Sequence, residues 1–125
     1  MLAGTGRRGA LVYLADHGEN LWEQPGLMLH MEFVPTLQTV EIPMYLYLTP
    51  DHPAKARAAA AVDKPFAAED LPWLLLDLGE LGFRPEETAA KSPLSPAFRP
   101  KKRIVSRSGI DYADLRKTGR GDRVK

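Results

Sequence analysis

The sequence predicts an α/β fold in which a sheet segment is flanked by helices. A continuous apolar run covers residues 10–15, as expected for a strand that is buried on both faces. A second apolar run covers residues 44–49, and leucines recur at helical spacing over residues 71–81. Strands that are followed by helices in this order indicate the α/β class, with fewer strands than a complete sheet of that class contains.

Prolines mark the connections of the two predicted strands. Residues 18–39 form a long loop region that Pro25-Gly26 and Pro35 interrupt. Pro43 precedes the second strand, and Pro50-Asp51-His52-Pro53 ends it, so His52 is interpreted as a turn residue. A loop of this length inside a compact domain is more often functional than idle.

Two helices are predicted after the second strand. Residues 54–62 are rich in alanine, which favours a helix, and Asp63-Lys64-Pro65 stops it. In the next helix Asp70 is placed to cap the N-terminus, Pro72 fits the first turn, and Gly82 closes the helix. We interpret the leucine stripe of this helix as core packing against the sheet; its members are Leu71, Leu74, Leu75, Leu78 and Leu81.

Beyond residue 83 the predicted structure is sparse. Residues 84–101 are rich in proline and polar residues, so we expect them to be irregular. Residues 103–106 are predicted to form a short edge strand, which Ser108-Gly109 turns into Asp111-Tyr112. After Tyr112 we expect the chain to fray.

The sequence Asp16-His17-Gly18-Glu19-Asn20 directly follows the first predicted strand. A carboxylate and a neutral imidazole are ligand types that zinc and related divalent ions take. Consecutive side chains of a regular strand point to opposite faces, so Asp16 and His17 can meet one ion only if the backbone turns, which Gly18 permits. The carboxyl end of a strand is also where open α/β sheets bind ligands. Taken alone, Asp-His-Gly is more often a turn with a capping aspartate than a metal site, but the preceding apolar strand favours the metal site.

Composition limits the classes of protein to which this chain can belong. A chain of 125 residues has room for one modest core, and its 44% hydrophobic content argues against outright disorder. No stretch approaches the roughly 20 apolar residues of a membrane span, and the first apolar run is shorter than the h-region of a secretory signal. The absence of cysteine excludes disulfides and thiol chemistry but leaves the compartment open.

The net charge of +1 hides an uneven distribution. From residue 99 onward there are ten Lys or Arg and three Asp, whereas residues 1–98 hold seven basic and thirteen acidic side chains. We interpret the basic segment as a solvated terminal arm; attraction to anionic phospholipid or lipopolysaccharide phosphate is the alternative. Nucleic-acid binding is not expected, because the basic residues are not interleaved with aromatic ones beyond Phe98 and Tyr112.

Three segments, residues 11–21, 27–30 and 40–47, resemble the phosphoethanolamine transferases of the alkaline phosphatase and sulfatase superfamily. Residues 70–78 are similar to the helix of that family after the second strand. Residues 95–105 with Asp111-Tyr112 look like the closing segment of the subgroup that modifies lipopolysaccharide core sugars. The resemblance covers nearly the whole chain, but only as the C-terminal part of a much longer family protein.

The resemblance implies an incomplete alkaline-phosphatase-like sandwich. Residues 1–98 would be the C-terminal part of a sulfatase-like catalytic domain, and residues 99–125 a basic C-terminal segment with a short strand and a frayed tail. The family's membrane spans and the rest of its catalytic domain would lie upstream, in a protein of the inner membrane with a periplasmic catalytic domain. This chain alone shows neither a signal nor a span.

The resemblance also implies roles for individual residues. Asp16 and His17 carry over as metal ligands, with Zn²⁺ as the expected ion and another divalent metal as the alternative. His30 carries over as the histidine that contacts the substrate phosphate. The nucleophilic threonine and an acidic ligand have no counterpart here, so no catalytic residue is assigned and the chain is expected to be inactive alone. The implied substrates are a phospholipid donor and a lipid A or lipopolysaccharide core-sugar acceptor.

The chain departs from the family pattern at several positions. Ala15 stands where Ser is usual, Trp22 where Gly is common, and Met31 where Gly normally follows the histidine. The interval between His17 and His30 is also one residue longer than usual. None of these departures changes Asp16 or His17.

Two other functions fit the same residues. A fragment of a sulfatase, or of another phosphoric or sulfuric ester hydrolase, would share Asp16 and His17 and differ in the missing nucleophile. A non-catalytic remnant would act, if at all, through its basic tail. The identity of the upstream nucleophile would distinguish the hydrolase fragment from the transferase. Metal content and turnover would distinguish the non-catalytic remnant from both.

Overall fold

The computed structural model describes residues 7–23, 28–29, 34–105 and 108–118. By its contacts the chain divides into two compact units. The helical unit combines Met1–Tyr13 with Tyr45–Lys101, and the motif unit combines Leu14–Met44 with Lys102–Lys125. This division does not test the predicted boundary between residues 98 and 99, which stays a prediction.

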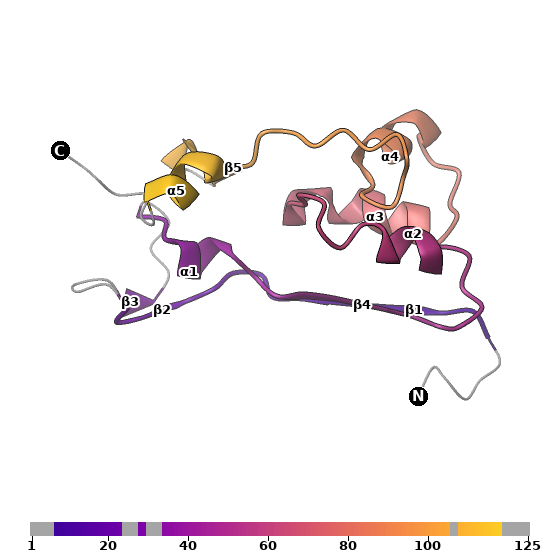
Figure 1. The fold of residues 1–125 in the computed structure, drawn as a ribbon, viewed down its shortest axis with the longest axis horizontal. Coiled ribbons are helices and arrows are strands. Elements are labelled where there is room, and N and C mark those ends of the chain that lie inside the picture. The colour runs from indigo at the N-terminus through magenta and orange to yellow at the C-terminus, as the bar shows by residue number, and fades with distance from the viewer. Residues whose placement is uncertain (1–6, 24–27, 30–33, 106–107, 119–125) are drawn as a thin grey trace. The chain divides into compact units, whose positions relative to one another are not determined.

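Strands β1 (Ala10–Leu14) and β4 (Met44–Leu48) pair with each other, as Figure 1 shows. The carbonyl of Gly9, just before β1, accepts a hydrogen bond of 3.0 Å from the N–H of Thr49, just after β4. The start of one strand therefore lies beside the end of the other, and the pair is antiparallel. Both strands fall where the sequence predicts them, and the α/β class is confirmed.

The prediction that the first strand is buried on both faces is wrong for this ladder. Leu11 and Tyr13 of β1 are 55% and 56% exposed, and Tyr45 and Tyr47 of β4 are 66% and 44% exposed. The rings of Tyr13 and Tyr45 lie side by side, with centroids 6.0 Å apart. Within the helical unit the helices lie on one side of the ladder (Figure 1), so a continuous apolar run is covered on one face only.

The two predicted helices are present but shorter. They are α2 (Lys55–Ala59) and α3 (Leu71–Leu78), the latter preceded by a 3₁₀ turn, η2 (Ala68–Asp70). Pro72 lies in the first turn of α3, as predicted. The helix ends before Gly82 because the N–H groups of Glu80 and Leu81 donate to the carbonyls of Asp77 and Leu76, an arrangement that terminates helices. Glu80 supplies the left-handed residue that this arrangement needs, with φ 51°.

The leucine stripe of α3 is narrower than predicted. Leu74 and Leu78 are buried, at 1% and 7% exposure, whereas Leu75 and Leu81 are exposed. Helix α3 packs against α4 (Pro85–Lys91), a neighbour that covers only part of its surface. The prediction of an irregular segment over residues 84–101 is therefore wrong for its first half. Pro85 at the helix start, acidic residues in the first turn and Lys91 in the last turn all favour that helix.

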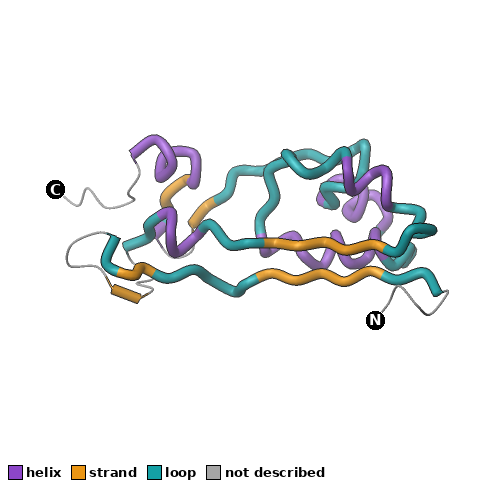
Figure 2. Tube along the Cα trace, turned by 60° about the horizontal axis from the view of Figure 1, so that its bottom comes forward, coloured by secondary structure: helices purple, strands orange, loops and turns teal. Residues whose placement is uncertain are grey.

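The C-terminal segment is more regular than predicted. Strands β5 (Ile104–Val105) and β6 (Ile110–Asp111) pair antiparallel, which confirms the predicted edge strand, and Gly109 turns between them with φ 68°. Instead of fraying after Tyr112, the chain forms α5 (Tyr112–Thr118), which Figure 2 shows as the last helix. Leu115 anchors this helix because its side chain is fully buried.

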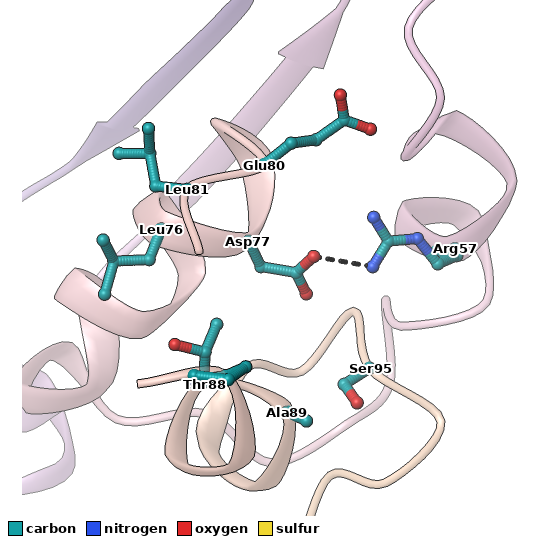
Figure 3. Close-up of a pocket in the computed structure, with 9 residues that line it drawn as sticks. Arg57, Leu76, Asp77, Glu80, Leu81, Thr88, Ala89 and Ser95 are labelled. Atoms are coloured by element: carbon teal, nitrogen blue, oxygen red, sulfur yellow. Dashed lines mark hydrogen bonds and ion pairs between the residues drawn. The ribbon is translucent and has the colours of Figure 1, made fainter. Parts of the chain in front are cut away.

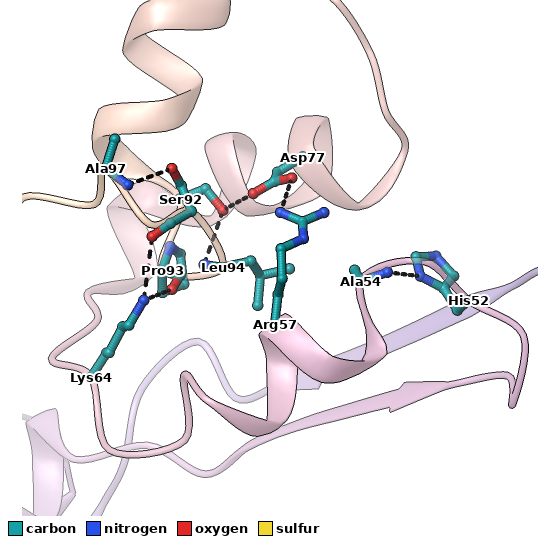
Figure 4. A network of polar contacts seen from close by, with 10 residues as sticks. His52, Ala54, Arg57, Lys64, Asp77, Ser92, Pro93, Leu94 and Ala97 are labelled. Atoms are coloured by element: carbon teal, nitrogen blue, oxygen red, sulfur yellow. Dashed lines mark hydrogen bonds and ion pairs between the residues drawn. The ribbon is translucent and has the colours of Figure 1, made fainter.

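Polar contacts hold the helical unit together (Figure 4). The carboxylate of Asp77 accepts hydrogen bonds from Arg57 at 2.8 Å and from the Ser92 hydroxyl at 2.6 Å. Nδ1 of His52 accepts from the N–H of Ala54 at 3.1 Å, so His52 is a turn residue, as predicted. Asp70 occupies the N-cap position of α3 without a side-chain cap bond and pairs with Lys101 at 3.0 Å instead.

No helix in the described part of the chain is long and apolar enough to cross a membrane.

Candidate metal site

Asp16 and His17 lie in the loop that leaves β1, in the motif unit. The Asp16 side chain is 91% exposed and the His17 side chain 42% exposed, so both are accessible to an ion. Nε2 of His17 lies 3.9 Å from Oδ2 of Asp16. The other carboxylate oxygen, Oδ1, accepts a hydrogen bond of 3.0 Å from the His17 N–H, which keeps the carboxylate beside the ring.

The contacts of the His17 ring favour one neutral tautomer. Nδ1 lies 3.1 Å from the Gly18 carbonyl oxygen and 3.5 Å from Oε1 of Glu19. Both oxygens are acceptors, so they favour the tautomer with the hydrogen on Nδ1, in which Nε2 carries the lone pair. A metal-ligating histidine commonly donates its second ring nitrogen to a backbone carbonyl or carboxylate in this way. In that tautomer the lone pair lies on Nε2, the ring nitrogen that is 3.9 Å from Oδ2 of Asp16.

The Asp16-His17 pair fits part of a metal site. Two ligands at ordinary zinc bond lengths and tetrahedral angles lie about 3.3 Å apart, and the observed distance between Nε2 and Oδ2 is 3.9 Å. Zinc sites in proteins use at least three protein ligands. In the part of the chain that the structure describes, no group of three His, Cys, Asp or Glu side chains is placed to hold a metal. The pair supplies two ligands and requires others from elsewhere.

Gly18 is needed for a different reason from the one the sequence suggests. Its φ lies outside the left-handed region. Instead, its Cα packs so closely on the following segment that an added Cβ would lie 1.9 Å from the carbonyl oxygen of Gln38. The Gly18 N–H donates to the carbonyl of Thr39 at 3.0 Å. The glycine therefore allows the loop to dock on residues 38–39.

Sequence reasoning missed a buried polar cluster behind the pair. Asn20 and Thr36 are fully buried and Thr39 is 8% exposed. Thr36 caps α1 (Leu37–Val40): its hydroxyl accepts from the N–H of Thr39, and the Thr39 hydroxyl accepts from the N–H of Thr36. The Thr36 hydroxyl also donates to Oδ1 of Asn20 at 2.8 Å. The sequence signal for this cap was the spacing of Thr36 and Thr39, which lie three positions apart as in a capping box.

His30, the predicted phosphate contact, lies outside the described residues. Just before His30 in the sequence, β2 (Asn20–Leu21) pairs with β3 (Met28–Leu29). Trp22 follows β2 with φ 68° and a side chain that is 64% exposed. The left-handed conformation favours glycine, so Trp22 adopts a backbone conformation that is unfavourable for a residue with a side chain.

The helical unit contains a pocket of about 230 Å³ between α3 and α4 (Figure 3). Its polar wall includes Glu80, Thr88 and the Arg57-Asp77 ion pair at 2.8 Å. The Arg57 guanidinium is paired with Asp77, which offsets its charge. The pocket is not the predicted site, whose described residues all lie in the motif unit.

In a comparison with solved structures, the chain matches the C-terminal periplasmic domain of EcEptC from Escherichia coli, with a TM-score of 0.73 and 26% sequence identity. The match covers 84% of this chain and 32% of that chain, so this chain spans about a third of the length of its structural neighbour. Neither the protein-family models nor the curated proteins contain a match. The resemblance that the sequence predicts is confirmed: the chain is similar in fold and sequence to the C-terminal part of a phosphoethanolamine transferase.

Proposed function

We propose that this chain is the C-terminal part of a metal-dependent transferase that moves phosphoethanolamine from a phospholipid donor to lipid A or a core sugar of lipopolysaccharide. The observation that carries the proposal is the Asp16-His17 pair at the end of β1, with Nε2 and Oδ2 3.9 Å apart, in a chain similar to the EcEptC domain. In the full-length protein this part would belong to a periplasmic catalytic domain anchored in the inner membrane.

In this proposal Asp16 and His17 hold Zn²⁺ through Oδ2 and Nε2. Bound zinc would neutralise charge on phosphoryl oxygens and lower the pKa of a hydroxyl nucleophile. Asp16 also fixes the backbone of its neighbour by accepting the His17 N–H. His30 would contact the substrate phosphate through its ring. The nucleophile and the remaining ligands would come from protein outside this sequence.

The pair predicts that the 125-residue chain binds zinc weakly and turns over no substrate. Two ligands without a nucleophile leave the transfer without its covalent step. Removing one ligand should abolish zinc binding, because a single side chain and solvent do not hold the ion.

The test is a zinc titration of the wild-type chain and of Asp16→Ala and His17→Ala, by competition with a coloured chelator. The control is Asp63→Ala, which removes an exposed carboxylate from the helical unit and should leave binding unchanged. Equal zinc affinity in all four proteins would contradict the metal role. Robust transferase or phosphatase turnover by the chain alone would contradict its dependence on a missing nucleophile.

A further inference from the structure

The loop that carries Asp16 and His17 is held by residues that follow it in the sequence. The first link is the Gly18 N–H, which donates to the Thr39 carbonyl at 3.0 Å. The second is the close approach of Gly18 to Gln38, which leaves no room for a Cβ. Both links fix Gly18, whose carbonyl oxygen lies 3.1 Å from Nδ1 of His17.

A third link runs through buried side chains. The Asn20 amide oxygen accepts the Thr36 hydroxyl hydrogen at 2.8 Å, and both residues are fully buried. Thr36 is itself fixed by its reciprocal bonds with Thr39 at the start of α1. Buried polar groups that satisfy one another in this way are rigid, because breaking one bond leaves a desolvated partner.

We infer that Asn20 and Thr36 are positioning residues for the Asp16-His17 metal pair. They hold α1 against the loop, and α1 holds Gly18. The Gly18 carbonyl in turn favours the hydrogen of His17 on Nδ1, with the lone pair of Nε2 on the side of Asp16. The inference rests on the proposed function for the role of the metal. The tautomer of the His17 ring, however, can be measured in the absence of metal.

The test uses the 125-residue chain and Zn²⁺ alone. Thr36→Val keeps the shape of the side chain and removes the hydroxyl, and is expected to weaken zinc affinity about 10-fold, the lower end of the range for residues that hold a metal-ligating histidine. Thr36→Ser keeps the hydroxyl and should retain the wild-type affinity. Asn20→Ala removes the acceptor while leaving the capping bonds of α1 in place, and should act like Thr36→Val.

The second readout is ¹⁵N NMR of the His17 ring nitrogens, recorded without metal at a pH where the ring is neutral. The wild-type chain and Thr36→Ser should show hydrogen on Nδ1, whereas Thr36→Val and Asn20→Ala should show exchange between both tautomers. The control for a general loss of stability is Thr88→Val, which removes a buried hydroxyl that donates to the Phe83 carbonyl at 2.9 Å in the helical unit. It should change neither readout.

The outcomes separate the two proposals. A wild-type tautomer and wild-type zinc affinity in Thr36→Val and Asn20→Ala would overturn the inference while leaving the proposed function intact. Unchanged zinc affinity in Asp16→Ala and His17→Ala would overturn the proposed metal role, and the tautomer would still decide whether Thr36 and Asn20 orient His17. Equal effects of Thr88→Val and Thr36→Val would also overturn the inference, since stability alone would explain both.

Discussion

At the scale of single residues, the backbone around Gly18 has no room for a larger side chain. The atom nearest to an added Cβ is the carbonyl oxygen of Gln38, at 1.9 Å. Because this atom belongs to the backbone, the collision can be relieved only by moving the loop away from α1. Such a movement would also break the bond between the Gly18 N–H and the Thr39 carbonyl.

Gly18→Ala is therefore expected to destabilise the chain by about 3 kcal/mol, the upper end of the range for overpacking. Gly82→Ala is the matched control, since nothing lies within 4 Å of its added Cβ and its φ is not left-handed. That variant should be neutral or more stable by about 0.4–1 kcal/mol, because alanine restricts the unfolded chain. Urea unfolding of the two variants measures the difference; equal midpoints would contradict the close approach at Gly18.

The individual residues show what a sequence can and cannot reveal about this site. The sequence indicates Asp16 and His17 as candidate ligands because both ligand types stand together at the end of an apolar run, and their metal role stays a prediction. The pairing of Asn20 with Thr36 was not, because it joins residues sixteen positions apart through a fold that no local pattern defines. The sequence indicated that a glycine is needed at position 18 but not the reason. The reason is the close approach of Gln38, which lies later in the chain.

At the scale of elements, prolines and glycines marked the strand boundaries well, while burial was harder to predict. An apolar run reveals that a strand exists, but the number of its covered faces depends on how many layers pack on it, and β1 has an exposed face with Leu11 and Tyr13. Helix α4 was missed because the many prolines of residues 84–101 indicate irregular structure. One of them, Pro85, instead marks the start of the helix. Helix α5 was missed because basic, polar tails often fray.

Helix α5 is tied to the segment before β4 within the motif unit. The hydroxyl of Tyr112, the first residue of α5, donates to Oε1 of Glu41, and the guanidinium of Arg103 lies 4.1 Å from the centre of the Tyr112 ring. The bond to Glu41 raises the pKa of Tyr112 above its ordinary value, and burial of the hydroxyl adds to the rise. Folding therefore favours the protonated hydroxyl.

The raised pKa predicts a pH-dependent contribution from this contact. The folded pKa exceeds the unfolded value of about 10, so the stabilisation is fully present below pH 10 and is lost as the pH rises through the folded pKa. Tyr112→Phe should cost about 1 kcal/mol at neutral pH and much less above the folded pKa. Tyr47→Phe, on the exposed face of β4, is the control. Denaturant unfolding at pH 7 to 11 measures the difference, and a cost that does not fall with pH would contradict the contact.

At the scale of the whole molecule, the described core is small. Fewer hydrophobic side chains than polar ones are buried in the described ranges, so little apolar area offsets the conformational entropy of folding. A chain of this kind is expected to be marginally stable alone. The buried hydrophobic residues are Ala54, Leu74, Leu78, Leu94 and Leu115.

The exposed face of the β1–β4 ladder predicts that the isolated chain self-associates. Leu11, Tyr13, Tyr45 and Tyr47 are each at least 44% exposed on this two-stranded ladder, and apolar strand surfaces beside unpaired edges favour association with another chain. Sedimentation velocity over a range of concentrations should show oligomers that grow with concentration. Tyr45→Lys should shift the chain toward monomer without unfolding it, because the substituted side chain is 66% exposed. Val62→Lys, at 79% exposure outside the ladder, adds the same charge and should leave the association unchanged. A wild-type chain that stays monomeric at every concentration, or equal effects of the two lysines, would show that this face does not drive association.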